Sequence, residues 1–101
     1  MRGIFGVAAG ALLGLCAVAS AQDQAQIEAG EALYDEHCAS CHGEKLRSAG
    51  AIPDLRELPA DARPRFNTTV LDGRGQMPAW SGTLGEPELA QIWAYIRSRA
   101  R

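Results

Sequence analysis

The chain lacks the features of a large fold or of a nucleic-acid surface. Its 101 residues leave room for one small domain and no second core. With 10 Lys and Arg against 12 Asp and Glu, it has no basic excess, which argues against a nucleic-acid binder. No segment alternates apolar and polar residues as a half-buried strand does, and no internal repeat is present. These absences point to a small helical protein.

Cysteine and histidine are also scarce, but most of them are gathered in one short segment. Cys38-Ala39-Ser40-Cys41-His42 has the C-x-x-C-H spacing that attaches a c-type haem. Residues three apart on a helical turn face the same way, so Cys38 and Cys41 can both form thioether bonds to the haem vinyl groups. His42 is then held under the iron as the proximal ligand. The segment therefore predicts one covalently bound haem c per chain.

Two other uses of this segment are less favoured. A zinc site needs four ligands and would have to recruit His37 from a cramped position beside Cys38. A thioredoxin-like dithiol normally lies near a βαβ pattern, and this sequence has no such pattern.

The first 21 residues have the pattern of a signal peptide. Arg2 supplies the positive charge, residues 4–18 form an uncharged run rich in apolar residues and glycine, and Ala19-Ser20-Ala21 is a small-x-small cleavage site. The run is shorter than the roughly 20 residues of a membrane span. We predict cleavage after Ala21 and a periplasmic protein, with an uncleaved N-terminal anchor as the alternative.

The predicted mature chain, residues 22–101, is a mildly acidic dipole. Cys38 and Cys41 are its only cysteines, so no structural disulfide is expected. Residues 22–44 contain six acidic residues and no Lys or Arg, whereas residues 45–74 contain six basic and four acidic residues. This asymmetry would influence encounters with charged partners.

Apolar residues recur at helical spacing near both ends of the mature chain. We predict a first helix over residues 24–38, with Ile27, Gly30, Leu33 and Tyr34 on one side. Glycine weakens a helix, so Gly30 is expected to let another helix approach closely.

The last helix is the clearest periodic segment and should pack on the first. It follows the start signal Gly85-Glu86-Pro87-Glu88, and its apolar positions are Leu89, Ile92, Trp93 and Ile96. A shorter helix is predicted over residues 64–72, begun by Pro64, with Phe66 and Val70 on one face and Gly73 at its end.

Met77 is the candidate for the second axial ligand of the iron. It lies in a Gly-rich loop before Pro78 and is the only methionine apart from Met1. A thioether is a soft, neutral ligand that stabilises Fe(II) and raises the reduction potential into the range of an electron carrier. The alternative is that Met77 only fills a gap in the packing.

Two further residues are predicted to support the haem. The Pro53 carbonyl could accept a hydrogen bond from the second ring nitrogen of His42 and so fix the orientation of the ring. Arg56 could bind a haem propionate, the alternative being a solvated arginine. Trp80 and Trp93 could pack on the haem or in the core, and His37 is expected at the surface.

With these motifs, residues 24–101 resemble class I cytochromes c. The resemblance rests on the C-x-x-C-H segment, Pro53-Asp54-Leu55, Met77-Pro78 and the helix contacts of Gly30 and Tyr34 with Ile92 and Tyr95. It implies an all-α fold, a small helical bundle wrapped around covalent haem c. The cofactor-binding residues would be Cys38, Cys41, His42, Met77, Pro53 and Arg56, and the iron ligands His42 and Met77.

A narrower similarity points to a partner. Pro53-Asp54-Leu55-Arg56, residues 70–73 and residues 75–80 are similar to the cytochrome domain of quinohaemoprotein alcohol dehydrogenases. The resemblance implies an electron carrier, not an enzyme, or the electron-transfer subunit of a dehydrogenase. It would accept electrons from a periplasmic quinoprotein alcohol dehydrogenase and pass them to an oxidase or another cytochrome, touching the membrane only through such partners. The alternatives are a haem-based sensor or ligand-binding protein in which Met77 is displaceable, and a small peroxidase, for which no distal histidine is evident.

Overall fold

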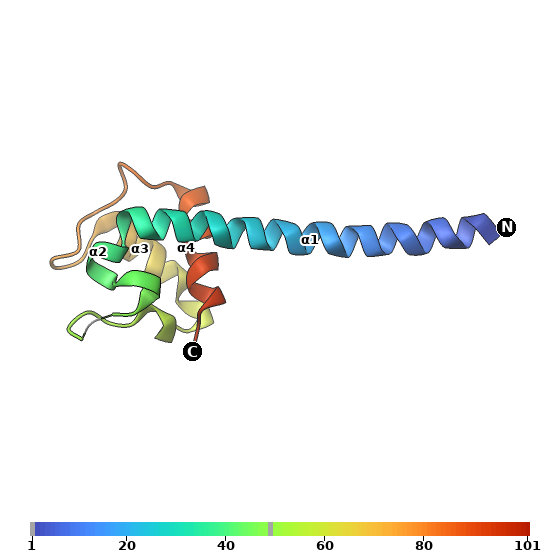
Figure 1. The fold of residues 1–101 in the computed structure, drawn as a ribbon. Helices are drawn as coiled ribbons and strands as arrows, with labels where there is room; N and C mark the ends of the chain where they lie inside the picture. Colours follow the sequence, from blue (N-terminus) through green and yellow to red (C-terminus); the bar gives the residue numbers. More distant parts are fainter. Residues whose placement is uncertain (1, 49) are drawn as a thin grey trace.

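A single long helix, α1 (Arg2–His37), dominates the computed structural model in Figure 1. The structure describes the backbone of residues 2–48 and 50–101 and the side chains from residue 18 onward, except residue 49. At 1.5 Å per residue, the 36 residues of α1 extend about 54 Å. The other helices gather around its C-terminal part, so the molecule measures 66 × 27 × 24 Å.

The predicted start of the first helix is wrong, whereas its predicted end lies within one residue of the observed end. It was expected over residues 24–38, but α1 begins at Arg2 and ends at His37. Residues 2–37 contain no proline and many alanines and leucines, which are strong helix formers, so nothing local starts a new helix at Gln24. Cleavage after Ala21 stays a prediction. In the described part of the chain, no helix combines the length and apolar character that a membrane crossing requires.

Short turns and three more α-helices follow α1. They are α2 (Ala39–His42), the 3₁₀ turns η1 (Glu44–Leu46), η2 (Leu55–Glu57) and η3 (Ala60–Ala62), then α3 (Arg63–Asp72) and α4 (Glu86–Ser98). Over residues 2–48 and 50–101 the chain forms no strand, and its one isolated bridge joins Arg74 and Met77. The predicted all-α fold is therefore confirmed.

Local signals explain where α3 and α4 begin and end. Pro64 lies in the first turn of α3, and Gly73 ends that helix with φ +78°. At the start of α4, the Gly85 N–H donates to Glu88 Oε1 at 2.8 Å. Glu88 therefore caps the first turn, where acidic side chains also complement the helix dipole. The predicted short and last helices are confirmed.

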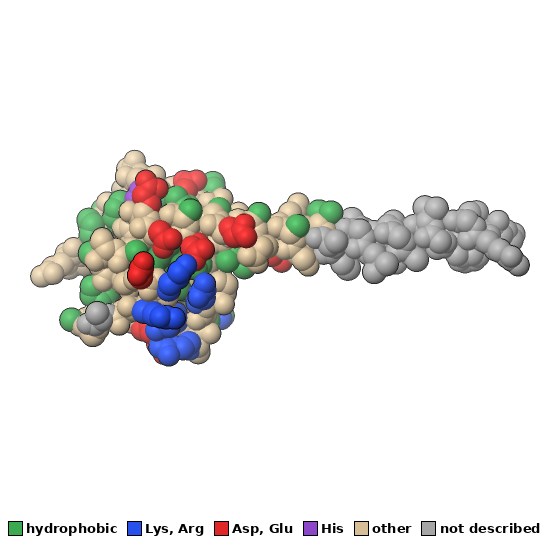
Figure 2. All heavy atoms as spheres, viewed as in Figure 1, with side chains coloured by type: hydrophobic (Ala, Val, Ile, Leu, Met, Phe, Trp, Pro, Cys, Tyr) green, Lys and Arg blue, Asp and Glu red, His purple; other side chains and the backbone are tan. Residues whose placement is uncertain are grey.

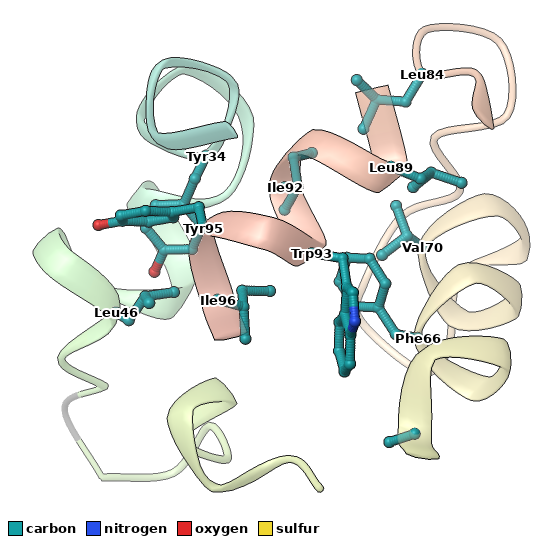
Figure 3. Packing of buried hydrophobic residues seen from close by; sticks show 11 residues of the cluster. Tyr34, Leu46, Phe66, Val70, Leu84, Leu89, Ile92, Trp93, Tyr95 and Ile96 are labelled. Carbon is teal, nitrogen blue, oxygen red and sulfur yellow. The ribbon is translucent and has the colours of Figure 1, made fainter. Parts of the chain in front are cut away.

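The helices α1 and α4 approach so closely that their backbones are in contact at Gly30. A Cβ atom added there would lie 1.8 Å from the Gln91 carbonyl oxygen. Beside this point, the rings of Tyr34 and Tyr95 pack with their centroids 5.5 Å apart (Figure 3). The predicted role of Gly30 is confirmed.

The core lies between this crossing and α3. Leu89, Ile92, Trp93 and Ile96 are all buried, as the periodicity of α4 predicted. Trp93 packs on Phe66 of α3 with ring centroids 5.1 Å apart, as Figure 3 shows. Trp93 is therefore a core residue. The core thus joins the first and last helices to the helix that precedes the Met77 loop.

We predict that Gly30→Ala destabilises the protein by about 1–3 kcal/mol, because the methyl group would meet the Gln91 carbonyl and force the helices apart. Chemical denaturation of the haem-containing protein measures the loss. Ala32→Gly, at an exposed position of the same helix, is the control and should cost about 1 kcal/mol from helix propensity alone. A Gly30→Ala variant that is more stable than the parent would contradict the close contact.

Candidate functional site

The C-x-x-C-H segment forms a single helical turn directly after α1. Cys38 precedes α2, and its carbonyl accepts from the His42 N–H at 2.9 Å and from the Cys41 N–H at 3.2 Å. This confirms the helical turn expected from the sequence. One turn therefore carries both thiols and the imidazole, with His42 as its last residue.

The two thiols differ in their surroundings. Cys38 is half-buried, and burial, followed by the neighbouring Cys41, raises its pKa to about 11. Cys41 is exposed, and the two form no disulfide. A redox-active dithiol needs a lowered thiol pKa, so the raised pKa of Cys38 does not favour the thioredoxin-like alternative.

The imidazole of His42 has the properties of a metal ligand. Burial lowers its pKa, which favours the neutral ring that binds metals. Its Nδ1 atom is buried and has no hydrogen-bond partner among the described residues. The hydrogen bond predicted from Nδ1 to the Pro53 carbonyl is therefore not formed in this structure. Pro53 itself is exposed, in the irregular stretch before η2.

Tyr34 fixes the end of the turn formed by residues 38–42, here called the haem-attachment turn. The sequence did not reveal this role. Its hydroxyl donates to the Gly43 carbonyl at 2.6 Å, directly after His42. The ring is completely buried. Burial raises the pKa of the Tyr34 phenol well above its ordinary value, so the phenol stays protonated and keeps donating.

Met77 lies in a tight turn that folds back on α3. Two backbone hydrogen bonds close the turn, from Met77 N–H to Arg74 O at 2.9 Å and from Arg74 N–H to Met77 O at 3.0 Å. A Cβ atom at Gly73 would lie 2.7 Å from the Met77 carbonyl oxygen, so a side chain there would displace the turn. Met77 is half-buried and packs against the core. The backbone of Met77 is therefore fixed relative to the end of α3 by these two hydrogen bonds and by the close approach of Gly73.

His37 is not the surface residue that the sequence predicted. Its side chain is only 17% exposed, and its ring packs edge-on against Trp80 at a centroid distance of 5.1 Å. The expectation considered only the helix that carries His37. It is wrong because the loop after Met77 returns to the C-terminal end of α1 and partly covers the ring.

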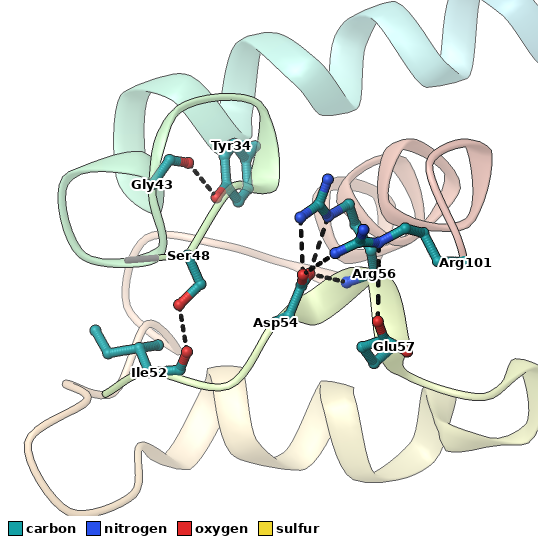
Figure 4. A network of polar contacts seen from close by, with 8 residues as sticks. All are labelled: Tyr34, Gly43, Ser48, Ile52, Asp54, Arg56, Glu57 and Arg101. Atoms are coloured by element: carbon teal, nitrogen blue, oxygen red, sulfur yellow. Dashed lines mark hydrogen bonds and ion pairs between the residues drawn. The ribbon is translucent and has the colours of Figure 1, made fainter. Parts of the chain in front are cut away.

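Arg56 is held by a carboxylate within its own turn (Figure 4). Its Nε and NH2 atoms donate to the two oxygens of Asp54 at 3.0 and 2.8 Å, and its backbone N–H donates to Asp54 Oδ1 at 2.9 Å. The side chain is 19% exposed, so the solvated arginine of the alternative interpretation is not observed.

Arg101 joins this pair from the other end of the sequence. Its NH2 atom donates to Asp54 Oδ2 at 2.9 Å, and its backbone N–H donates to the Arg56 carbonyl at 2.9 Å. The hydrogen bonds from Arg56, with that from Arg101, hold the pKa of Asp54 well below its ordinary value of 3.8. The network ties the loop after Pro53 to the segment that follows α4.

The site is not a conventional metal-binding cluster. Among the described residues, no three His, Cys, Asp or Glu side chains are grouped to hold a metal ion, as the zinc alternative would require. A surface groove of about 500 Å³ lies between α1 and α4, lined in part by Ile27, Trp93 and Arg97. None of the predicted haem residues lines this groove.

Comparison with known proteins decides the family. The family described as cytochrome c oxidase, cbb3-type, subunit III matches residues 25–96. Cytochrome c6 of Tetradesmus obliquus is 34% identical over 85 residues, which cover 75% of this chain and 93% of that protein. The chain belongs to the cytochrome c family. The resemblance drawn from the motifs is thereby confirmed.

This cytochrome is also similar to one domain of a larger enzyme. Quinohemoprotein alcohol dehydrogenase ADH-IIG of Pseudomonas putida is 37% identical over 84 residues, 81% of this chain. Its solved structure superposes with a TM-score of 0.72 and 38% identity over 77% of this chain. The chain spans only 12% of the length of that dehydrogenase.

The residues present fit the haem c that the family implies. His42 Nδ1 is buried and has no hydrogen-bond partner among the described residues. A buried polar atom of this kind calls for an explanation, and haem binding that brings a partner to Nδ1 would supply one. The free thiols of Cys38 and Cys41 lie on the same turn. The remaining predicted ligand, Met77, is a soft donor in a closed turn.

We predict that Asp54→Asn destabilises the cytochrome at neutral pH, and that this effect becomes smaller as the pH falls below the ordinary pKa of 3.8. Because the folded-state pKa is lowered, the stabilisation is fully present above the ordinary value of 3.8 and is lost as pH falls through the lower folded-state value. Denaturation midpoints of both proteins, measured from about pH 7 to about pH 2, test this.

The matched control is Asp61→Asn. Asp61 is exposed and takes part in no ion pair recorded in the described part of the chain. It should show little difference from the parent at any pH. A constant gap between the parent and Asp54→Asn across the whole range would contradict the role given to the ion pair.

Proposed function

We propose that this cytochrome is a periplasmic shuttle that carries single electrons from a quinoprotein alcohol dehydrogenase to an oxidase or another cytochrome. The observation that carries this proposal is a single C-x-x-C-H turn combined with a closed turn that presents Met77. The names of the relatives support a donor and an acceptor of these kinds. One is an alcohol dehydrogenase, and the matching family is named for an oxidase subunit.

Each candidate residue has a defined part in holding the haem. Cys38 and Cys41 would form the thioether bonds, and His42 and Met77 would be the two axial ligands of one haem per chain. Haem iron, when bound, supplies reversible one-electron transfer. The protein contributes an imidazole that burial keeps neutral and a thioether that favours the reduced iron. With both axial positions filled by side chains, the iron would not bind a substrate.

Two neighbouring residues would complete the haem environment. Arg56 uses Nε and NH2 for Asp54, which fixes the plane of the guanidinium. A guanidinium fixed in this way loses little entropy when it binds an anion, which supports a role at a haem propionate. Pro53 stays the proposed partner of His42 Nδ1 in the haem-bound chain.

The predicted signal peptide, residues 1–21, supports export. Removal after Ala21 would leave residues 22–101, the part that contains every proposed haem residue. The mature protein would meet a membrane only through its redox partners.

The charge distribution supports recognition of a partner by electrostatic steering. Figure 2 shows acidic side chains along α1 and basic side chains beside them. At the boundary, Lys45 Nζ lies 3.0 Å and Arg99 NH2 lies 3.9 Å from Glu31 Oε2. Exposed ion pairs of this kind contribute little to stability, but the separated charges beyond them can orient an approaching protein.

We predict that Met77→Ala lowers the reduction potential and opens the iron, because water would replace a ligand that favours Fe(II). The ferric methionine-to-iron charge-transfer band should disappear, and the ferrous protein should bind carbon monoxide readily. Spectroscopy and redox titration measure these changes.

Gln76→Ala, at the exposed neighbour in the same turn, is the control and should retain the band. Acidified acetone should leave the haem attached in every variant, and colour that washes away would contradict the thioether bonds at Cys38 and Cys41. Retention of the native band and potential in Met77→Ala would refute the ligand assignment. A parent protein that already binds carbon monoxide readily would support the sensor with a displaceable Met77.

We predict that a quinoprotein alcohol dehydrogenase, reduced by its alcohol, reduces this cytochrome in a second-order reaction followed by stopped flow. The rate should change by about tenfold between low ionic strength and about 200 mM salt, because steering is screened. Glu28→Gln on acidic α1 should alter the low-salt rate, whereas Asp72→Asn at the end of α3 is the control. A rate that does not respond to salt would count against steering, and no reduction would refute this donor class.

A further inference from the structure

The proposed axial ligands, His42 and Met77, lie in two segments of the described chain that no hydrogen bond or ion pair joins. His42 ends the turn that follows α1, whereas Met77 lies in the loop between α3 and α4. The loop is fastened to α3 by backbone hydrogen bonds from Trp80 N–H to Val70 O at 2.9 Å and from Ser81 N–H to Leu71 O at 3.3 Å. These bonds fix the loop relative to α3, but not relative to the haem-attachment turn.

One side-chain contact spans the two segments. His37 is the last residue of α1, directly before Cys38, and Trp80 follows Met77 by three residues. Their rings meet edge to face, with centroids 5.1 Å apart and planes at 61°. This geometry is favoured for aromatic rings because the edge of one ring carries positive partial charge and the face of the other negative.

No polar contact supplements the ring pair between these two described segments. Between residues 37–43 and residues 73–85, all of them described, no hydrogen bond or ion pair is recorded. Glu36 is the charged group nearest to the ring, and its Oε2 lies 3.7 Å from His37 Nε2 without forming a hydrogen bond. Cys38, Met77 and Trp80 also pack against the core, and the ring pair adds a direct contact between the two segments.

We propose that His37 is a positioning residue which, through Trp80, holds the Met77 loop against the haem-attachment turn and keeps the thioether on the iron. The inference rests on the proposed role of Met77 as an axial ligand. An outside ligand can reach the iron only when the loop opens, so its apparent affinity follows the population of the open loop. Loss of the ring contact increases that population without altering either axial ligand.

The test is imidazole binding to the ferric protein at constant pH, followed by loss of the methionine-to-iron charge-transfer band. His37→Leu and Trp80→Leu should each tighten imidazole binding by about two- to tenfold, the range expected for one aromatic pair. The double variant should bind little more tightly than either single variant, because the same contact is lost in all three. His37→Phe, which restores an aromatic edge, should remain close to the parent.

Phe66→Leu is the matched control. It weakens the Phe66–Trp93 pair in the core, which has the same centroid distance of 5.1 Å, and neither residue belongs to a segment that carries an axial ligand. It should lower the melting temperature without tightening imidazole binding.

Three outcomes would overturn the inference: fully additive effects of His37→Leu and Trp80→Leu, unchanged imidazole binding in both, or equal tightening in Phe66→Leu. Failure of the proposed function has a different signature. If Met77 is not an axial ligand, the charge-transfer band is already absent from the parent protein, before any variant is made.

Discussion

The close contact between α1 and α4 at Gly30 is the constraint on which the remaining structure depends. Because no side chain separates Gly30 from the Gln91 carbonyl, the two helices meet backbone to backbone. That distance lets the buried rings of Tyr34 and Tyr95 pack beside the contact. Tyr34 then reaches the Gly43 carbonyl and sets the end of the turn that carries Cys38, Cys41 and His42. The helix pair therefore positions the haem-attachment turn as well as the core.

Much of the fold could be predicted because it follows from local periodicity. The buried residues of α3 and α4 recur at helical spacing, and both helices have clear start or stop signals. Gly30 lies on the same predicted face as the apolar residues of α1, which indicated the helix crossing. The start of α1 could not be predicted in this way. The pattern of a targeting segment and the pattern of a helix overlap in residues 2–23, and a cleavage signal says nothing about where hydrogen bonding along the backbone begins.

In the candidate site, too, the local features could be predicted and the contacts between distant segments could not. The C-x-x-C-H turn is local, so its helical geometry follows from the order of the residues alone. The partner of Asp54 that lies 47 positions away, Arg101, has no local signal, because ion pairs between distant segments depend on how the whole chain folds. The partial burial of His37 was missed for the same reason, since the residue that packs against it belongs to a loop 43 positions later. The predicted bond from His42 to Pro53 spans an irregular loop, where spacing alone fixes no geometry, so it stays a prediction for the haem-bound chain.

The Tyr34 hydroxyl has a consequence for how such a protein can change over evolution. The same phenol packs at the helix crossing and donates to the carbonyl that follows His42. Selection for a tighter or looser helix pair would therefore shift the imidazole that we assign to the iron, and with it the driving force for electron exchange. Thermal robustness and redox tuning would be inherited together, and a mutation that improves one would need compensation to preserve the other.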